Sequence, residues 1–265
     1  PELGEALLDD LEWLGFDWDQ GPRVGGPDGP YWQSERYGLY DQALQALQES
    51  GQMYPCFCNR ARIQSIASAP HPGEELHPHT VQHLYDGHCR YLSLREVMNK
   101  RLEKNPSYRI ALENATYRYQ DRWQGFCERD VLAGYDDFVL KRADGMFAYN
   151  LAVVREDVAM GVTEVIRGCD LLDVTPYQLA LYDLLGATAP VYGHAPLLMD
   201  EEGHRLSKRQ GYITVKELRE SGYSPQAVWG HLCQATGLVE NVPRGGLSLR
   251  DLVVLCGDGF LDNPI

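Results

Sequence analysis

The sequence contains no long apolar run, and this absence limits where the protein can work. No stretch approaches the roughly 18 consecutive apolar residues of a membrane span, and no basic segment followed by an apolar stretch marks a secretion signal. Internal repeats and low-complexity tracts are also absent. A chain of 265 residues, 44% of them hydrophobic, can nevertheless bury a sizeable core. We therefore expect a soluble, cytoplasmic globular protein without a membrane partner.

Positive charge is also scarce, because 24 Lys and Arg residues stand against 38 Asp and Glu residues, for a net charge of −14. Unspecific binding to nucleic acids relies on Lys and Arg to displace counterions. A DNA partner is therefore not expected, and any RNA contact must use a local patch. The segment 90–142 is less acidic than the rest and is a candidate, although a solvated face of mixed charge is the alternative. Its basic residues include Arg95, Lys100, Arg101, Lys104, Arg109, Arg118, Arg122 and Arg129.

Cysteine is present in an odd number, seven, and Cys56 and Cys58 lie one residue apart. This pattern suits reduced thiols or a metal site better than a disulfide framework. With Cys89, three thiolates could fill three corners of a tetrahedral zinc site, and an oxygen or nitrogen donor could fill the fourth. From the residues alone, a metal site and three unrelated cysteines both remain open. The candidates for the fourth ligand are Tyr85, His83 and His88.

Helical and strand patterns alternate along the chain and predict an α/β fold. Thr175 is expected to cap a helix that Gly186 ends, and Thr214 with Glu217 forms a predicted capping box. The alternation implies a mostly parallel sheet wrapped by helices, followed by a small helical tail. Helical patterns begin at Leu3, Glu35, Thr175, Thr214 and Ser224, and strand patterns cover 138–142, 162–166 and 191–199.

Two further groups of residues carry possible chemistry. Leu206-Ser207-Lys208-Arg209 follows a glycine-bearing loop, and a lysine beside a hydroxyl can place positive charge on a phosphate. In isolation this tetrapeptide is more typical of a solvated surface loop. Tyr149 and Arg167 each lie near an expected strand, where the sheet could present both to one pocket. Arg167 could bind a carboxylate through two hydrogen bonds, although a surface ion pair is the default.

Six motifs occur in the same order as in class I aminoacyl-tRNA synthetases of the glutamyl type, and the chain resembles that family from Pro1 to about Leu238. Each motif is short, but the ordered set is specific. The motifs are Leu11-Glu-Trp-Leu-Gly-Phe-Asp-Trp-Asp19, Gln33-Ser-Glu-Arg36, Cys56-Phe-Cys58, Tyr85-Asp-Gly-His-Cys-Arg90, Met160-Gly-Val-Thr-Glu-Val-Ile-Arg-Gly168 and Arg205-Leu-Ser-Lys-Arg209.

The resemblance implies an architecture. Residues 1–200 would form a Rossmann-like catalytic core with a parallel sheet and a zinc-bearing insertion at about 52–130. Residues 201–265 would form the signature loop and the helical tail. In this family a strand and an HxGH-like segment that contact ATP come first, and the resemblance places both before Pro1, so the catalytic core is expected to be incomplete at its N-terminus.

The resemblance also implies a role for each matching site residue. Tyr149 and Arg167 would hold the substrate glutamate. The segment 206–208 would bind ATP together with Mg²⁺, and Lys208 would stabilise phosphate charge during catalysis. The ATP-binding residues are Leu206, Ser207 and Lys208, and the zinc ligands are Cys56, Cys58, Tyr85 and Cys89.

Two branches of the family differ in the RNA that they modify. The segments 144–154 and 68–71 resemble the glutamyl-Q type, which transfers glutamate to queuosine in the anticodon of tRNA(Asp). Conventional glutamyl-tRNA synthetases charge tRNA(Glu) and usually have asparagine at the position of Val153. The resemblance favours the glutamyl-Q type, with a fragment of a conventional synthetase as the alternative. A catalytically silent, zinc-stabilised RNA-binding module is the alternative from another class.

Overall fold

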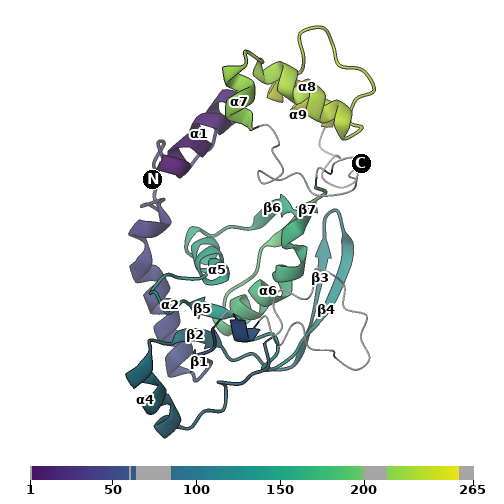
Figure 1. Ribbon diagram of the computed structural model, residues 1–265. Coiled ribbons are helices and arrows are strands. Elements are labelled where there is room, and N and C mark those ends of the chain that lie inside the picture. The colour runs from purple at the N-terminus through teal and green to yellow at the C-terminus, as the bar shows by residue number, and fades with distance from the viewer. Residues whose placement is uncertain (1, 60, 64–84, 198, 200–213, 257–265) are drawn as a thin grey trace. The chain divides into compact units, whose positions relative to one another are not determined.

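The structure is a computed structural model that describes residues 2–59, 61–63, 85–197, 199 and 214–256. Figure 1 shows and labels its helices and strands. The chain divides into two compact units, of which one spans Asp28–His194 and the other combines Pro1–Pro27 with Ala195–Ile265. The division expected at residue 200 differs from this partition and stays a prediction, as does the extent of the inserted region.

The strands of the described residues belong to two sheets, ordered β1-β2-β5 and β4-β3-β7-β6. The three-stranded sheet is antiparallel, with Met53 opposite Ile110 and Tyr108 opposite Lys141. The bounds are β1 (Met53–Cys56), β2 (Ser107–Ile110), β3 (Ala115–Asp121), β4 (Gly125–Val131), β5 (Val139–Lys141), β6 (Glu164–Gly168) and β7 (Val191–Ala195).

The four-stranded sheet contains both strand directions. β3 and β4 are antiparallel, because the connection 122–124 is too short to join two parallel strands. β3 and β7 are parallel, with Asp121 opposite Tyr192. The predicted parallel pairing is thus present between β3 and β7, whereas the hairpin and the other sheet are antiparallel.

One core collects the apolar faces of three helices. The buried residues of α2 are Tyr40, Ala43, Leu44 and Leu47. Their spacing of i, i+3, i+4 and i+7 puts them on a single helix face. The core also contains Leu151 of α5, Leu181 of α6 and Leu140 of β5, all fully buried. The helices of this unit are η1 (Gln33–Glu35), α2 (Tyr37–Glu49), α4 (Leu94–Glu103), α5 (Tyr149–Met160), η3 (Cys169–Val174) and α6 (Thr175–Leu184).

The start of α6 differs from the sequence prediction. Val174 is the N-cap, and Thr175 is the first helical residue. The 3-10 helix η3 runs directly into α6, so no extended residue precedes the helix to serve as a side-chain cap. The Thr175 hydroxyl instead donates to the Leu171 carbonyl at 3.2 Å. The predicted end of the helix is confirmed, since Gly186 follows with a φ of +64°.

The other unit is built from helices, as the predicted tail requires. The capping box is confirmed: the Glu217 amide donates to the Thr214 hydroxyl at 3.2 Å, and the Thr214 amide donates to the Glu217 carboxylate at 2.6 Å. Trp229 Nε1 donates to the Leu14 carbonyl at 2.8 Å and joins α8 to α1. Among the described residues, no helix is both long and apolar enough to cross a membrane. The helices are α1 (Glu2–Leu14), α7 (Val215–Glu220), α8 (Pro225–Ala235) and α9 (Leu249–Cys256).

We predict that Leu151→Ala lowers the free energy of unfolding by about 2 to 5 kcal/mol, because truncating a fully buried leucine leaves a cavity. Leu102→Ala is the matched control, since Leu102 is 88% exposed on α4, and this change should stay within about 0.5 kcal/mol. Urea unfolding followed by circular dichroism measures both variants. Equal losses in the two variants would contradict the assigned core.

Candidate active site

Three cysteines of the predicted zinc set lie together in the structure. The Sγ atoms of Cys56, Cys58 and Cys89 all lie within 4.8 Å of one another, so this group could hold a metal ion. The Sγ atoms of Cys58 and Cys89 are 3.7 Å apart. Tyr85 completes the group, because its hydroxyl oxygen lies 3.5 Å from Cys56 Sγ. Cys56 ends β1, and the turn at Gly87, where φ is +67°, brings Tyr85 and Cys89 back toward it.

The surroundings of Cys56 favour its thiolate, whereas hydrogen bonds with Cys56 and Cys89, together with burial, raise the pKa of the Cys58 thiol. Hydrogen bonds from the Cys58 and Cys89 thiols lower the pKa of the Cys56 thiol, despite its burial. The buried Arg109 adds to this effect, since its Nε donates to Cys56 Sγ at 3.4 Å and its guanidinium lies 4.0 Å from the centre of the Tyr85 ring. Thiolate is the form that binds metal ions.

The surroundings of Arg109 argue against the basic RNA-binding patch that the sequence suggested for residues 90–142. Only 6% of this residue is exposed, and its Nη1 donates to the Asp137 carbonyl at 2.5 Å, so it is not available to a phosphate. On the β3–β4 hairpin, Arg118 pairs with Glu128 across the strands. The mixed-charge interpretation therefore fits this part of the segment better than a free basic patch.

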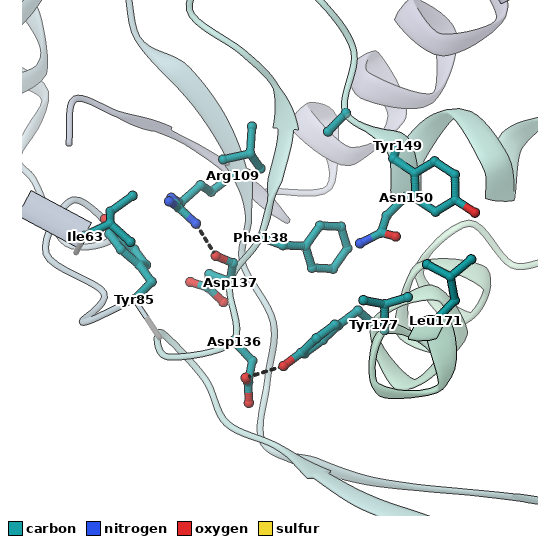
Figure 2. Close-up of a pocket in the computed structure, with 13 residues that line it drawn as sticks. Ile63, Tyr85, Arg109, Asp136, Asp137, Phe138, Tyr149, Asn150, Leu171 and Tyr177 are labelled. Carbon is teal, nitrogen blue, oxygen red and sulfur yellow. Dashed lines mark hydrogen bonds between the residues drawn. The ribbon is translucent and has the colours of Figure 1, made fainter. Parts of the chain in front are cut away.

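A cavity of about 380 Å³ extends from the cysteine cluster toward α5. Figure 2 shows Tyr85 at one side of it and Tyr149 and Asn150 at the other. The aromatic rings of Phe138 and Tyr177 lie between these two sides. Polar groups are few on its walls, and the cavity therefore has the character of a ligand site, in which mostly apolar walls carry a small number of placed polar groups.

The two residues predicted to bind the substrate glutamate, Tyr149 and Arg167, lie in different places. Tyr149 is the first residue of α5 and lines the cavity. Arg167 lies on β6 and is not among the lining residues. Its guanidinium is held by protein acceptors: Nε donates to His194 Nε2 at 2.9 Å, Nη1 to Gln178 Oε1 at 2.7 Å and Nη2 to Thr175 Oγ1 at 2.8 Å. Its role as a carboxylate ligand stays a prediction.

A buried pair, Asp121 and His194, lies next to Arg167. Neither residue was predicted from the sequence as part of a site. His194 Nδ1 lies 2.6 Å from Asp121 Oδ2, and both residues are fully buried. The other oxygen of Asp121 accepts from the backbone amides of Trp123, Gln124 and His194. Only the parallel pairing of β3 with β7 brings this pair together, which is why no local pattern indicates it.

Several predicted residues lie outside the described part of the chain. The ATP-binding residues Leu206 and Ser207, the catalytic Lys208 and the alternative ligand His83 belong to this group. Their roles stay predictions. His88, the other alternative ligand, is exposed, whereas Tyr85 is buried against the thiols.

Comparison with known proteins defines the class. Residues 1–241 match the family model described as tRNA synthetases class I (E and Q), catalytic domain, and the chain belongs to this family of ATP-using ligases. A crystal structure of glutamate-tRNA synthetase from Elizabethkingia anophelis matches with a TM-score of 0.72 and 26% identity, covering 96% of this chain and 55% of that one. The predicted class I α/β fold is thereby confirmed.

Particular relatives narrow the comparison. A glutamyl-Q tRNA(Asp) synthetase from Symbiobacterium thermophilum is 48% identical over 91% of this chain and 73% of its own length. One from Nitratidesulfovibrio vulgaris is 44% identical over 92% and 74%. Glutamate–tRNA ligase 1 of Halorhodospira halophila is 38% identical over 91% of this chain but 50% of its own length. The chain thus spans about three quarters of the glutamyl-Q relatives and about half of the glutamate ligase.

We predict a pH-dependent stability that originates at His194. Burial and the Arg167 charge lower the pKa of His194, while the facing carboxylates of Asp121 and Asp170 oppose this shift. The unfolded chain therefore binds more protons between the lowered pKa and the ordinary value of about 6.5. The contribution of His194 to the free energy of unfolding should be fully present above about pH 6.5. It should decrease as the pH falls from there toward the lowered pKa.

Urea unfolding at several values between about pH 5 and about pH 8 measures the slope. The His194→Gln variant, which has no titrating ring, should lack this part of the pH dependence. Parallel pH profiles in the variant and the unmodified protein would show that His194 is not the group responsible.

Proposed function

We propose that the protein activates glutamate with ATP and transfers the glutamyl group to queuosine in the anticodon of tRNA(Asp), acting in the cytoplasm. The observation that carries this proposal is the match to glutamyl-Q relatives, at up to 48% identity over nearly three quarters of their length. The glutamate–tRNA ligase 1 of Halorhodospira halophila is 38% identical, and half of it lies beyond the matched part.

The reaction has two steps. In the first, a carboxylate oxygen of glutamate attacks the α-phosphorus of ATP, and pyrophosphate leaves. In the second, a hydroxyl of the acceptor nucleoside attacks the carbonyl carbon of the adenylate, loses its proton, and AMP leaves. Neither step needs a covalent enzyme intermediate, so catalysis rests on positioning and on stabilising phosphate charge.

Residues of this chain would divide these tasks. Tyr149 and Arg167 would bind glutamate, and the segment 206–208 would bind ATP with Mg²⁺, with the charge of Lys208 on the phosphates. An anticodon loop suits the acceptor role, because unstacked loop bases are the part of RNA most open to side-chain contacts. The cavity beside Tyr149 could receive such a base directly.

We also propose that the cysteine cluster and Tyr85 hold one zinc ion. Bonds of about 2.3 Å to sulfur and about 2.0 Å to oxygen place two thiolates of a tetrahedral site about 3.8 Å apart, and a thiolate and an oxygen about 3.5 Å apart. The distance between Cys58 and Cys89 is 3.7 Å, and that between Cys56 and Tyr85 is 3.5 Å. The bound ion would fix the segment around residue 88 against β1, because metal binding supplies folding free energy.

We predict one zinc ion per chain, and we predict that combining Cys56→Ser with Cys58→Ser removes it. Two hydroxyls cannot replace two thiolates as ligands at neutral pH. Elemental analysis after dialysis measures the metal content. Cys127→Ser is the control, because Cys127 lies on β4 outside the cluster and should leave the zinc in place. Zinc-free protein, or full retention by the double variant, contradicts this site.

The acceptor is tested with labelled glutamate and three RNAs: tRNA(Asp) with queuosine, tRNA(Asp) without it, and tRNA(Glu). We expect the full-length protein to label only the first, because the proposed nucleophile is a hydroxyl of queuosine. Stable label on tRNA(Glu), with none on queuosine-containing tRNA(Asp), would instead establish a conventional glutamyl-tRNA synthetase. Glutamate-dependent pyrophosphate exchange confirms activation separately from transfer.

A further inference from the structure

A chain of hydrogen bonds leads from the buried Asp121 to the wall of the cavity. Asp121 Oδ2 contacts His194 Nδ1 at 2.6 Å, and His194 Nε2 accepts from Arg167 Nε at 2.9 Å. Arg167 Nη1 donates to Gln178 Oε1 at 2.7 Å. Gln178 Nε2 in turn donates to Asn150 Oδ1 at 3.1 Å. Asn150 lines the cavity next to Tyr149, so the chain ends at the cavity.

The chemistry of arginine fixes the direction of every bond in this chain. A guanidinium can only donate, so His194 must accept with Nε2 and carry its proton on Nδ1, toward Asp121. For the same reason, Gln178 must present its oxygen to Arg167 and its NH₂ group to Asn150. Asn150 must therefore accept with Oδ1. Gln178 and His194 are fully buried, which leaves them no water to relieve a reversed bond.

These bond directions determine which atoms Asn150 presents to the cavity. With its oxygen turned toward Gln178, the Asn150 side chain directs its Nδ2 amide group away from Gln178, and this group can only donate. Figure 2 shows the blue amide nitrogen of Asn150 directed toward Phe138, inside the ring of lining residues. An occupant of the cavity would therefore meet a donor at this point and must supply an acceptor atom.

The remaining walls suit a flat, partly apolar occupant. Phe138 and Tyr177 offer aromatic surfaces, and single-stranded RNA bases stack on such rings. At the opposite wall, the Asp136 carboxylate accepts from the Tyr177 hydroxyl at 2.8 Å and keeps further lone pairs for a hydroxyl or amino group. The volume of about 380 Å³ is in the range of small-molecule sites. Arg109 also lines the cavity, but it is buried and its Nη1 donates to the Asp137 carbonyl.

We propose that this cavity holds the acceptor nucleoside of the RNA, and that Asn150 donates a hydrogen bond from Nδ2 to a carbonyl oxygen, ring nitrogen or hydroxyl oxygen of that nucleoside. Gln178 is a positioning residue, because it holds the Asn150 amide in the donor orientation. The proposal rests on the proposed function in one respect, namely that an RNA nucleoside receives the glutamyl group.

Two nearly isosteric variants test the donor in the full-length protein. Asn150→Asp removes both N–H donors, and Gln178→Glu keeps the acceptor for Arg167 but cannot donate to Asn150. Single-turnover transfer of labelled glutamate to RNA is compared with glutamate-dependent pyrophosphate exchange. We expect both variants to lose about tenfold or more in transfer relative to their change in exchange, the effect of one lost hydrogen bond.

Matched controls separate the donor from other effects. Asn114→Asp makes the same chemical change outside the cavity, where Asn114 accepts from the Ala133 amide at 2.7 Å, and it should not change the ratio of transfer to exchange. Asn150→Leu removes the donor without adding charge and should behave like Asn150→Asp. If Asn150→Leu transfers normally, the loss in Asn150→Asp is an effect of charge, and the proposal is wrong.

The outcomes distinguish this proposal from the proposed function. Equal loss of exchange and transfer in Asn150→Asp would place Asn150 in the glutamate site, and no loss in either would remove it from substrate binding; both overturn the proposal. If the unmodified protein labels tRNA(Glu) instead, the proposed function fails, and the same comparison with tRNA(Glu) tests the nucleoside cavity. If it transfers glutamate to neither RNA, titration with both RNAs decides: weaker binding by Asn150→Asp supports the cavity, and equal or absent binding overturns it.

Discussion

The buried carboxylate of Asp121 is the contact on which the centre of the Asp28–His194 unit depends. One oxygen accepts from three backbone amides and closes the turn after β3, while the other binds the ring of His194 on β7. A buried carboxylate needs such partners, because an unpaired charge at this depth would be very costly. With Nδ1 of His194 bound to this carboxylate, Nε2 of the ring accepts from Arg167 Nε.

The cysteine cluster is a second constraint of another kind. It depends on three thiols that lie within 4.8 Å of one another, on the Tyr85 hydroxyl beside Cys56, and on Arg109, which stabilises negative charge on sulfur. Tyr85 belongs both to this cluster and to the wall of the cavity. A metal ion at the cluster would therefore hold one wall of the cavity in place, while the hydrogen-bond chain through Gln178 holds the opposite wall.

These two supports explain why the cavity fits the chemistry proposed for it. A class I synthetase must keep an activated carboxyl group and a nucleophilic hydroxyl in fixed geometry, since effective concentration provides much of the rate enhancement. Tyr149 and Asn150 are neighbours at the start of α5, so a residue assigned to glutamate and a donor assigned to the nucleoside share one rigid element. The family match shows the synthetase class, and the acceptor site proposed above lies in the cavity beside Tyr149.

The sequence by itself determined the features that depend on residues close together in the chain. The capping box at Thr214 and the helix end at Gly186 follow from neighbours in the chain, and the spacing of Cys56, Cys58 and Cys89 was enough to raise the possibility of a metal site. The predicted N-cap at Thr175 was wrong, because the 3-10 helix η3 runs directly into α6 and no extended residue precedes the helix.

Only the tertiary structure decided which distant residues meet. Arg109 looked like a surface cation and is buried under Tyr85, while Asp121 and His194 lie 73 positions apart in the chain and share a fully buried hydrogen bond. The orientation of the Asn150 amide depends on two hydrogen bonds, from Arg167 to Gln178 and from Gln178 to Asn150. A repeating pattern in the sequence cannot predict such contacts. The direction of a hydrogen bond depends on the chemistry of its partner, and here the partner comes from a distant part of the chain.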